Sequence, residues 1–328
     1  MRQQLDGTRT FRGYPTAQPD TVDAREARAA RGFIVGAPRS GTTLLVNLVA
    51  GHPEIAPIYE TGYLRNLLDL CERAEGAGFW ARCVARILGK DPLDKKTLRF
   101  VNKVLPYYQS TDRSKFGKTK DEFFPFGNRC IEYTFCELLH ETEKFARALS
   151  SAEDPFRAAR SYIDRLFAIH CARMSRPFWV NKTPSLVRCL ESLRRMYPEC
   201  AVLHIVRDGR DVAVSTITMK QGPSHVRAAA RRWRDMVLSG RRLRGHARYL
   251  EIRYEDLIAA PDEILKLVFA ALAVDGGAAR ALPGLNIYTH REKVWRAALA
   301  APERRAFAEE AGDLLIELGY EKDGAWIG

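Results

Sequence analysis

Residues 32–50 constrain the fold of this chain more than any other segment. A short apolar run, Gly-Phe-Ile-Val-Gly at 32–36, is followed by Ala-Pro-Arg-Ser-Gly-Thr-Thr at 37–43 and by an apolar-rich stretch at 44–50. This order predicts a buried strand, a tight turn and a helix. The N–H groups at the start of such a helix carry partial positive charge and can bind phosphate-like oxygens. The segment therefore predicts a strand–turn–helix unit with an anion-binding turn.

Three further strand candidates are each followed by a polar turn. They are 178–181, followed by Lys-Thr-Pro and a helix near 185–196; 201–206, followed by Arg-Asp-Gly-Arg and a helix from Asp211; and 248–253, followed by Tyr-Glu-Asp-Leu. Strands that alternate with helices favour a parallel sheet wound by right-handed crossovers. We therefore expect an α/β protein with a P-loop-type parallel sheet flanked by helices.

The rest of the chain is organised around this sheet. Residues 1–30 mix polar residues, glycine and proline without periodicity, which predicts a flexible N-terminal arm. Residues 31–328 are expected to form a single domain. Within this domain, residues 61–176 carry few strand signals and place apolar residues at helical spacing, for example at Leu64, Leu67 and Leu68. We expect a helical insertion at about 61–176 that caps the carboxyl edge of the sheet, where ligands of open α/β folds bind.

The composition gives only a broad indication of which classes of partner this protein binds. The 328 residues carry a net charge of +12, which suits anionic partners such as nucleic acid, an acidic membrane surface or phosphorylated small molecules. Much of this charge is spread along predicted helices, and solvated helix faces explain it equally well. The seven cysteines form no metal-ligand or disulfide pattern. Because there is neither a signal-peptide core nor a run of ~18 apolar residues, we expect a cytoplasmic protein without a membrane span.

The turn at 36–43 differs from the loops that bind ATP. In a kinase or NTPase loop, the second glycine is followed by Lys and then by a Ser or Thr that holds Mg²⁺. Here Thr42 and Thr43 follow Gly41, and the positive charge appears earlier, at Arg39. A sulfuryl group in transfer carries less negative charge than a γ-phosphate, so backbone amides and one or two cations can suffice. We assign Arg39, Ser40, Gly41, Thr42 and Thr43 to the binding turn and predict that no metal is required.

Two segments together resemble a known family. The string Pro-Arg-Ser-Gly-Thr-Thr-Leu at 38–44 resembles the 5′-phosphosulfate loop of the sulfotransferases that use 3′-phosphoadenosine 5′-phosphosulfate (PAPS). The segment 206–215 resembles the site of that family that binds the 3′-phosphate of the donor, which implies that Arg207 and Ser215 bind this phosphate. Arginine offers a planar fork of donors that suits a phosphate group. The matched segments run from about Gly32 to Tyr320, and the insertion is matched only at its ends.

Two more segments extend the resemblance. Arg-Tyr-Glu-Asp-Leu at the end of the fourth strand resembles a family segment near the adenine, which implies that Tyr254 contacts the base. His-Arg-Glu-Lys-Val-Trp-Arg near the C-terminus resembles a basic loop that closes over the donor. The family usually places Lys or Gly-Arg directly before the Trp, whereas Val294 intervenes here. Arg291, Lys293 and Arg296 therefore compete for the 3′-phosphate, and we assign that role to Lys293.

The catalytic residues most resemble those of the tyrosylprotein sulfotransferase-like and bacterial branch. Lys182, in Asn-Lys-Thr-Pro, matches a lysine that stabilises the bridging oxygen; a solvent-exposed lysine at a strand end is the alternative. Glu60, in Tyr-Glu-Thr, matches the general base of that branch, and a solvated loop glutamate is an equal alternative. Cytosolic small-molecule sulfotransferases use a histidine as the base, so His140 and His170 remain candidates.

The sequence therefore predicts transfer of the sulfuryl group of PAPS to a hydroxyl or amine of a small molecule or peptide. The transfer is an in-line displacement that releases the bisphosphate product PAP. The alternatives are a small-molecule or nucleotide kinase that uses Mg·ATP, which Thr42 argues against, and a nucleic-acid-binding protein, which only the net charge supports. The acceptor and the oligomeric state are not determined. Side chains of the insertion that offer an acceptor pocket, or border it, are Phe79, Trp80, Tyr107, Tyr108, Phe123, Phe124, Phe126, Lys115, Lys118 and Lys120.

Overall fold

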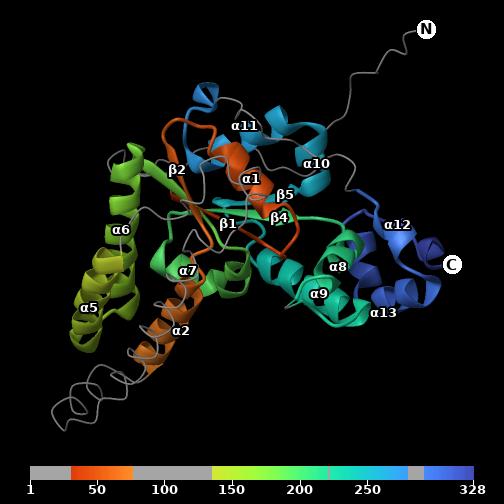
Figure 1. Ribbon diagram of the computed structural model, residues 1–328, viewed down its shortest axis with the longest axis horizontal. Helices are drawn as coiled ribbons and strands as arrows, with labels where there is room; N and C mark the ends of the chain where they lie inside the picture. The colour runs from red at the N-terminus through yellow and green to blue at the C-terminus, as the bar shows by residue number, and fades with distance from the viewer. Residues whose placement is uncertain (1–30, 77–134, 221, 280–291) are drawn as a thin grey trace.

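The computed structural model describes residues 31–76, 135–220, 222–279 and 292–328. These residues contain a five-stranded sheet in the order β2-β3-β1-β4-β5 (Figure 1). Every neighbouring pair of strands is parallel, which confirms the predicted α/β fold. The strands are β1 (Arg31–Gly36), β2 (Ile55–Tyr59), β3 (Phe178–Lys182), β4 (Ala201–Val206) and β5 (Tyr249–Arg253).

Helices connect the strands and flank the sheet (Figure 1). The α-helices are α1 (Thr42–Val49), α2 (Tyr63–Gly76), α5 (Phe135–Ser151), α6 (Pro155–Met174), α7 (Leu190–Met196), α8 (Gly209–Ile217), α9 (Val226–Arg241), α10 (Tyr254–Ala259), α11 (Pro261–Leu272), α12 (Trp295–Ala298) and α13 (Ala301–Glu317). The 3₁₀ helices are η3 (Pro184–Cys189), η4 (Gly276–Ala278) and η6 (Ala325–Ile327). None of the described helices is both long and apolar enough to cross a membrane.

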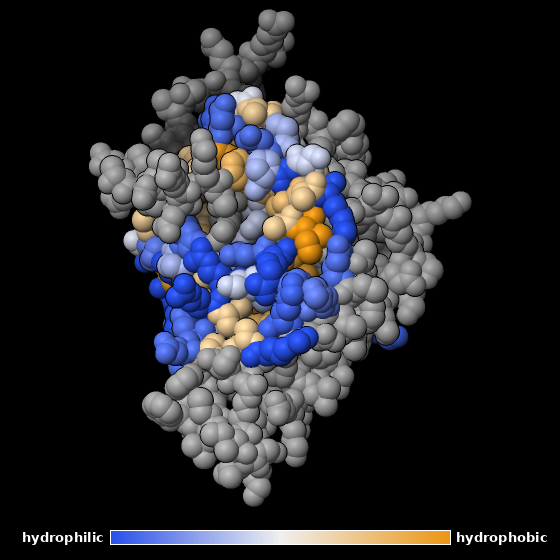
Figure 2. Space-filling model, turned by 90° about the vertical axis from the view of Figure 1, so that its left-hand side faces the viewer, coloured by the Kyte–Doolittle hydropathy of each residue, from blue (hydrophilic) through white to orange (hydrophobic). Residues whose placement is uncertain are grey.

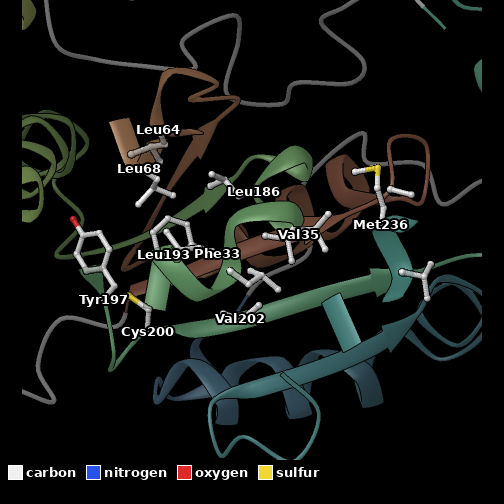
Figure 3. Close-up of a cluster of buried hydrophobic side chains, with 14 of the residues drawn as sticks. Phe33, Val35, Leu64, Leu68, Leu186, Leu193, Tyr197, Cys200, Val202 and Met236 are labelled. Carbon is white, nitrogen blue, oxygen red and sulfur yellow. The ribbon is translucent and has the colours of Figure 1, made fainter. Parts of the chain in front are cut away.

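Alternate residues of the strands enter two hydrophobic clusters, one on each face of the sheet. Phe33 and Val35 of β1 belong to the cluster that includes α2, α6, η3 and α9, whereas Ile34 packs with α1 and α11. Figure 3 shows part of the first cluster, in which Leu64 of α2 and Leu186 of η3 lie near β1. A strand that is covered on both faces needs apolar residues at successive positions. This explains the continuous apolar run that marks β1 in the sequence.

The order of the strands places the functional edge of the sheet. The helix that follows β1, α1, packs on one face, whereas α9, which follows β4, packs on the other. The neighbouring strands β1 and β4 therefore send their connections to opposite sides of the sheet. Such a topological switch point is where ligands of open α/β sheets bind, just beyond the carboxyl ends of the strands. The turn at 36–43 and the Arg-Asp-Gly-Arg turn meet at this edge.

The structure also contains elements that the sequence pattern did not indicate. Strand β2 has five buried residues, yet it contains Pro57, which lacks an N–H group and argues against a strand. Because β2 lies at the edge of the described sheet, the missing donor is tolerated there. The helix expected near 185–196 is divided into η3 and α7, since Cys189, the last residue of η3 and the N-cap of α7, has a non-helical φ of −125°.

The described part of the predicted insertion consists of α2, α5 and α6. These helices pack with one face of the sheet through the first hydrophobic cluster. The molecular face that carries α5 and α6 is mainly hydrophilic where its residues are described (Figure 2), and basic side chains there form ion pairs, including Arg165 with Glu141 and Arg173 with Glu137. The predicted arm at 1–30 and residues 77–134, with the aromatic and lysine side chains proposed to line or border an acceptor pocket, lie outside the described residues.

Candidate active site

The β1–α1 loop has the geometry of an anion cradle. Gly41 is the N-cap of α1 with a left-handed φ of 94°, and no side chain caps the helix there. A Cβ at this position would lie 2.4 Å from Cδ2 of Tyr254, so both the backbone and the packing require glycine. Ser40 is fully buried, and its Oγ has no hydrogen-bond partner among the described residues. A buried hydroxyl in this situation is costly unless a ligand accepts its proton.

The first two residues of α1 complete this loop. Thr42 is buried and Thr43 is half-buried, and both lie in the first turn of the helix. The first N–H groups of a helix have no partner within the helix, and the helix dipole makes that end attractive to anions. The five residues assigned to the turn from the sequence therefore lie together at the start of α1.

The loop after β4 contacts the β1–α1 loop directly. Nη1 of Arg207 donates to the carbonyl oxygen of Arg39 at 3.1 Å, and Nε of Arg39 donates to Oγ of Ser215 at 2.9 Å. Arg207 is also stacked on the ring of Tyr254, with its guanidinium carbon 4.6 Å from the ring centroid. Residues from the ends of β1, β4 and β5 thus converge. The Tyr254 side chain is largely buried, because it packs against Gly41 and Arg207.

Asp211 connects this cluster to the C-terminal basic segment. Its Oδ2 accepts from the backbone N–H of Lys293 at 2.8 Å, and its Oδ1 accepts from that of Trp295 at 3.0 Å. The same carboxylate lies 3.6 Å from Nη2 of Arg207. Burial raises the pKa of Asp211, and the two backbone hydrogen bonds act in the opposite direction. Asp211 lies between Arg207 and Ser215 in the segment that resembles the 3′-phosphate site, but the sequence pattern alone did not indicate a role for it.

The bonds to Asp211 fix the backbone around Lys293. Lys293 has a left-handed φ of 57°, an uncommon conformation for a residue with a Cβ, and its side chain is exposed. Arg296 is also exposed and lies over the ring of Trp295 at 5.6 Å. Arg291, the third candidate for the 3′-phosphate, lies outside the described residues.

Arg210 holds the β4–α8 loop against the C-terminal residues. Its side chain is 2% exposed and forms a bidentate pair with Asp208, with N–O distances of 3.0 and 2.8 Å. It also pairs with Glu321 at 2.5 Å and packs against the rings of both Trp295 and Trp326. A buried arginine needs this number of partners to offset its desolvation. These contacts make the loop that carries Arg207 stiff.

The two predicted catalytic residues form an ion pair on the other side of β1. Nζ of Lys182 donates to Oε1 of Glu60 at 2.5 Å, and the side chain of Lys182 is 1% exposed whereas that of Glu60 is 59% exposed. Lys182 is the register partner of Ile34 in β1, two residues before Gly36. The pair therefore lies at the carboxyl edge of the sheet, beside the β1–α1 loop.

A buried hydrogen-bond network supports this ion pair. Asn181 donates to Oγ1 of Thr61 at 2.7 Å and accepts from Oγ1 of Thr183 at 3.0 Å. The backbone N–H of Thr61 donates to Thr183, and that of Glu60 donates to the carbonyl oxygen of Lys182 at 2.7 Å. Glu60 itself has a left-handed φ of 48°. These hydrogen bonds hold the segments after β2 and β3 together. Neither the Glu-Thr string nor the Asn-Lys-Thr string alone predicted this contact between the two segments.

The alternative histidine bases lie elsewhere. His170 of α6 is fully buried, and its Nε2 is 3.1 Å from the carbonyl oxygen of Pro57. Burial lowers the pKa of His170 to about 4. Its ring is thus a neutral packing group between α6 and β2. His140 is exposed on α5.

Several known proteins are similar to this chain. The nodulation protein NoeE of Sinorhizobium fredii (strain NBRC 101917 / NGR234) is 23% identical over 333 residues, which cover 88% of this chain and 66% of that protein, slightly less than two thirds of its length. Similar solved structures include the sulfotransferase domain of the Synechococcus PCC 7002 olefin synthase (18% identity, TM-score 0.47, 88% of this chain and 95% of that one) and the sulfotransferase STF9 of Mycobacterium avium (18% identity, TM-score 0.42, 89% and 79%). The model of the sulfotransferase family matches residues 33–275, about three quarters of the sequence. The chain therefore belongs to the sulfotransferase family.

Proposed function

We propose that this protein transfers the sulfuryl group of PAPS to a hydroxyl or amine of an acceptor and releases PAP. The observation that carries the proposal is the contact between the two predicted phosphate loops, in which Arg207 donates to the Arg39 carbonyl and Arg39 donates to Ser215. The contact brings two helix N-termini and two guanidinium groups to one edge of the sheet. A donor with phosphate groups at both its 5′ and 3′ positions matches two adjacent anion sites.

The residues of the chain fit this donor. The amides at the start of α1 and the buried Oγ of Ser40 are suited to the 5′-phosphosulfate, because they need acceptors that the described residues do not supply. Arg207 and Ser215 are suited to the 3′-phosphate: Ser215 accepts from Arg39 and still has its own hydroxyl proton to donate. We assign Lys293 to the same phosphate and Tyr254 to the edge of the adenine site.

The ion pair of Glu60 and Lys182 is suited to the chemical step. Oε2 of Glu60 makes no hydrogen bond with the described residues, so it can accept the proton of the acceptor hydroxyl as the oxygen attacks sulfur. The S–O bond to the 5′-phosphate breaks, and its electron pair stays on the phosphate oxygen of PAP. Protonation of Glu60 removes the charge that holds Lys182. The ammonium group is then available to stabilise the developing charge on the leaving oxygen.

Two other functions are less well supported. A kinase that uses Mg·ATP would place a lysine where this chain has Thr42. A nucleic-acid-binding protein would need its excess of positive charge on an accessible surface. Many arginines of α9 are instead paired with carboxylates of α13, including Arg231 with Glu310 at 2.9 Å and Arg234 with Asp313.

The proposal is tested by donor binding and by one substitution. PAP should raise the melting temperature in the presence of EDTA, whereas Mg·ATP should have a much smaller effect; stabilisation by Mg·ATP alone would favour the kinase. Lys182→Ala should slow transfer from labelled PAPS by about 10³-fold while PAP affinity changes little, because Lys182 acts on charge that develops during transfer. Normal turnover by this variant would refute the assigned role.

A further inference from the structure

A groove adjoins the proposed catalytic pair. It has a volume of about 760 Å³ and lies between α2, the η3–α7 segment and the end of α9. Gly62, which follows Thr61, and Ser185, which follows Pro184 at the start of η3, line it. Because Thr61 is hydrogen-bonded to Asn181 and Thr183, the groove begins beside Glu60 and Lys182.

Four of the charged side chains that line this groove form two ion pairs with one another, Arg73 with Asp69 at 3.0 Å and Arg242 with Glu191 at 3.7 Å. Glu72 accepts a hydrogen bond from the neutral hydroxyl of Ser192. These residues lie farther along α2, along α7 and at the end of α9, away from Gly62. The part of the groove that is remote from the catalytic pair therefore carries no net positive charge.

Two arginines at the end near the catalytic pair differ from the others. Arg65 and Arg188 line the groove, are exposed, and form no ion pair or hydrogen bond with the described residues. Each lies three residues beyond a residue at the start of the groove, Arg65 beyond Gly62 and Arg188 beyond Ser185. Burial raises the pKa of Cys189, Arg65 and Arg188 act to lower it, and Glu72 and Asp69 act to raise it. Both guanidinium groups therefore lie within electrostatic reach of one sulfur atom, as do these two carboxylates.

Building on the proposed sulfuryl transfer, we propose that Arg65 and Arg188 bind an oxyanion of the acceptor, such as a carboxylate or phosphate group. The reacting hydroxyl then lies at Glu60, and the oxyanion lies about one helical turn, ~5 Å, along the groove. Arginine is suited to this role because its planar fork matches carboxylate and phosphate oxygens. Because both side chains are exposed, each contributes modestly to affinity, and their main effect is to select anionic acceptors over neutral ones.

The test uses matched pairs of hydroxylated compounds that differ in one anionic group. The pairs are 4-hydroxyphenylacetate and its amide, methyl glucuronide and methyl glucoside, and glycerol 3-phosphate and glycerol. Their affinity for the PAP-bound protein is measured by calorimetry, so that the result does not depend on turnover. At least one anionic compound should bind about fivefold or more tightly than its neutral partner. The same preference should appear in the transfer rate from PAPS for any pair that is sulfated.

Substitutions then test which arginines cause the preference for anionic acceptor compounds. Arg65→Ala and Arg188→Ala should each reduce it to about twofold or less, and Arg188→Glu should abolish it. Arg73→Ala is the matched control, since Arg73 lies on the same helix and groove but is already paired with Asp69. The inference is overturned if none of the pairs shows a preference in the wild-type protein, or if Arg73→Ala removes it as effectively as the other two substitutions.

Failure of this inference is distinguishable from failure of the proposed function. PAP affinity and the melting temperature are measured for each variant alongside the acceptor compounds. If the wild-type protein does not bind PAP, the assignment of the donor fails. If PAP binds equally to every variant and no oxyanion is preferred, the donor assignment stands and only the acceptor inference is wrong.

Discussion

The two halves of the carboxyl edge of the sheet are built differently. The donor half is the part proposed to bind the donor and consists of the loops after β1, β4 and β5 with residues 292–296; its polar side chains bond to one another across loops. Asp211 bonds two backbone N–H groups and Arg210 has four partners. The acceptor half is the part proposed to bind the acceptor and consists of the groove of α2 and η3, where Arg65 and Arg188 have no such partner among the described residues.

This difference suggests a division of labour between a rigid half and an adaptable half. A donor site works by pre-organised donors whose positions are fixed before the ligand arrives. Side chains that project into a solvated groove contribute little to that positioning, yet they can discriminate between acceptors by charge. Glu60 and Lys182 lie between the two halves. In this ion pair the side chain of Glu60 is 59% exposed, whereas that of Lys182 is 1% exposed. The following predictions test this division.

The largest effect is expected where the two halves meet. Glu60→Gln should slow transfer by about 10²- to 10⁴-fold, because the amide cannot accept the acceptor proton. PAP affinity should stay within about twofold of the wild-type value. Rates with labelled PAPS and PAP binding by calorimetry check both statements. Glu54→Gln, an exposed residue just before β2, is the control and should be active; wild-type turnover by Glu60→Gln would move the base to another residue.

The next effect should be confined to the donor half. Arg207→Ala should weaken PAP binding by about 100-fold, since it removes a guanidinium group together with its bond to the Arg39 carbonyl. Affinity for acceptor compounds should change little. Arg231→Ala, which breaks an exposed pair on α9, is the control. Equal losses of PAP and acceptor affinity in Arg207→Ala would show that the halves are not independent.

The third prediction concerns stability, in which the halves should behave alike. His170 contacts β2, the strand that precedes α2 of the acceptor half, and His204 lies in β4, the strand that precedes the Arg207 loop of the donor half, where it contacts Tyr249; burial lowers the pKa of each to about 4. An unfolded histidine titrates near ~6.5, so the unfolded chain binds more protons between these values. The stabilisation is present above pH 6.5 and is lost as the pH falls towards 4.

Each histidine should therefore contribute about 2 kcal/mol to the loss of unfolding free energy between pH 7 and pH 5. Denaturant titrations of the wild-type protein, His170→Gln and His204→Gln at both pH values measure this loss. The pH dependence should become smaller by a similar amount in both variants and remain unchanged in His140→Gln, which alters an exposed residue. An unchanged slope in His170→Gln would show that this ring is accessible to protons when folded.

The smallest effect is expected within the donor half, where Asp211 is predicted to position Lys293 for PAP binding. Asp211→Asn leaves one carbonyl oxygen for two backbone donors, so PAP affinity should fall by about tenfold as the segment around Lys293 loosens. Lys293→Gly removes the charge while glycine tolerates the left-handed φ of 57°. If Asp211 acts by positioning Lys293, the double variant should bind PAP about as weakly as the weaker single variant. Additive losses would instead assign Asp211 a separate role.

The sequence predicted those helices, strands and turns whose formation depends mainly on residues that are close together in the chain. The apolar run before Gly36 and the turn that follows predict β1, the loop and α1, because a buried strand and a helix start depend mainly on neighbouring residues. Strand β2 was missed for a related reason: Pro57 obscures its apolar run, and only its position at the edge of the sheet makes proline acceptable.

The pairing of Glu60 with Lys182 is a contact that local sequence patterns did not predict. Each residue was assigned by resemblance to a family motif, 122 positions apart in the chain. Their contact at 2.5 Å depends on the parallel register of β2 and β3 and on the network between Thr61, Asn181 and Thr183. No local pattern encodes these long-range bonds. The roles of the two residues in catalysis remain predictions for experiment.

The sequence by itself determined the parallel α/β class, the glycine-containing turn between β1 and α1 and the residue types proposed to bind the donor, since these follow from local periodicity, glycine and charge. Only the tertiary structure decided that Asp211 fastens Lys293 to α8, that Arg210 is buried against two tryptophans, and that Arg65 and Arg188 alone among the charged groove residues found no partner in the described chain. The sequence does not show whether a charged side chain is paired, buried or exposed, because segments that are distant along the chain form its environment.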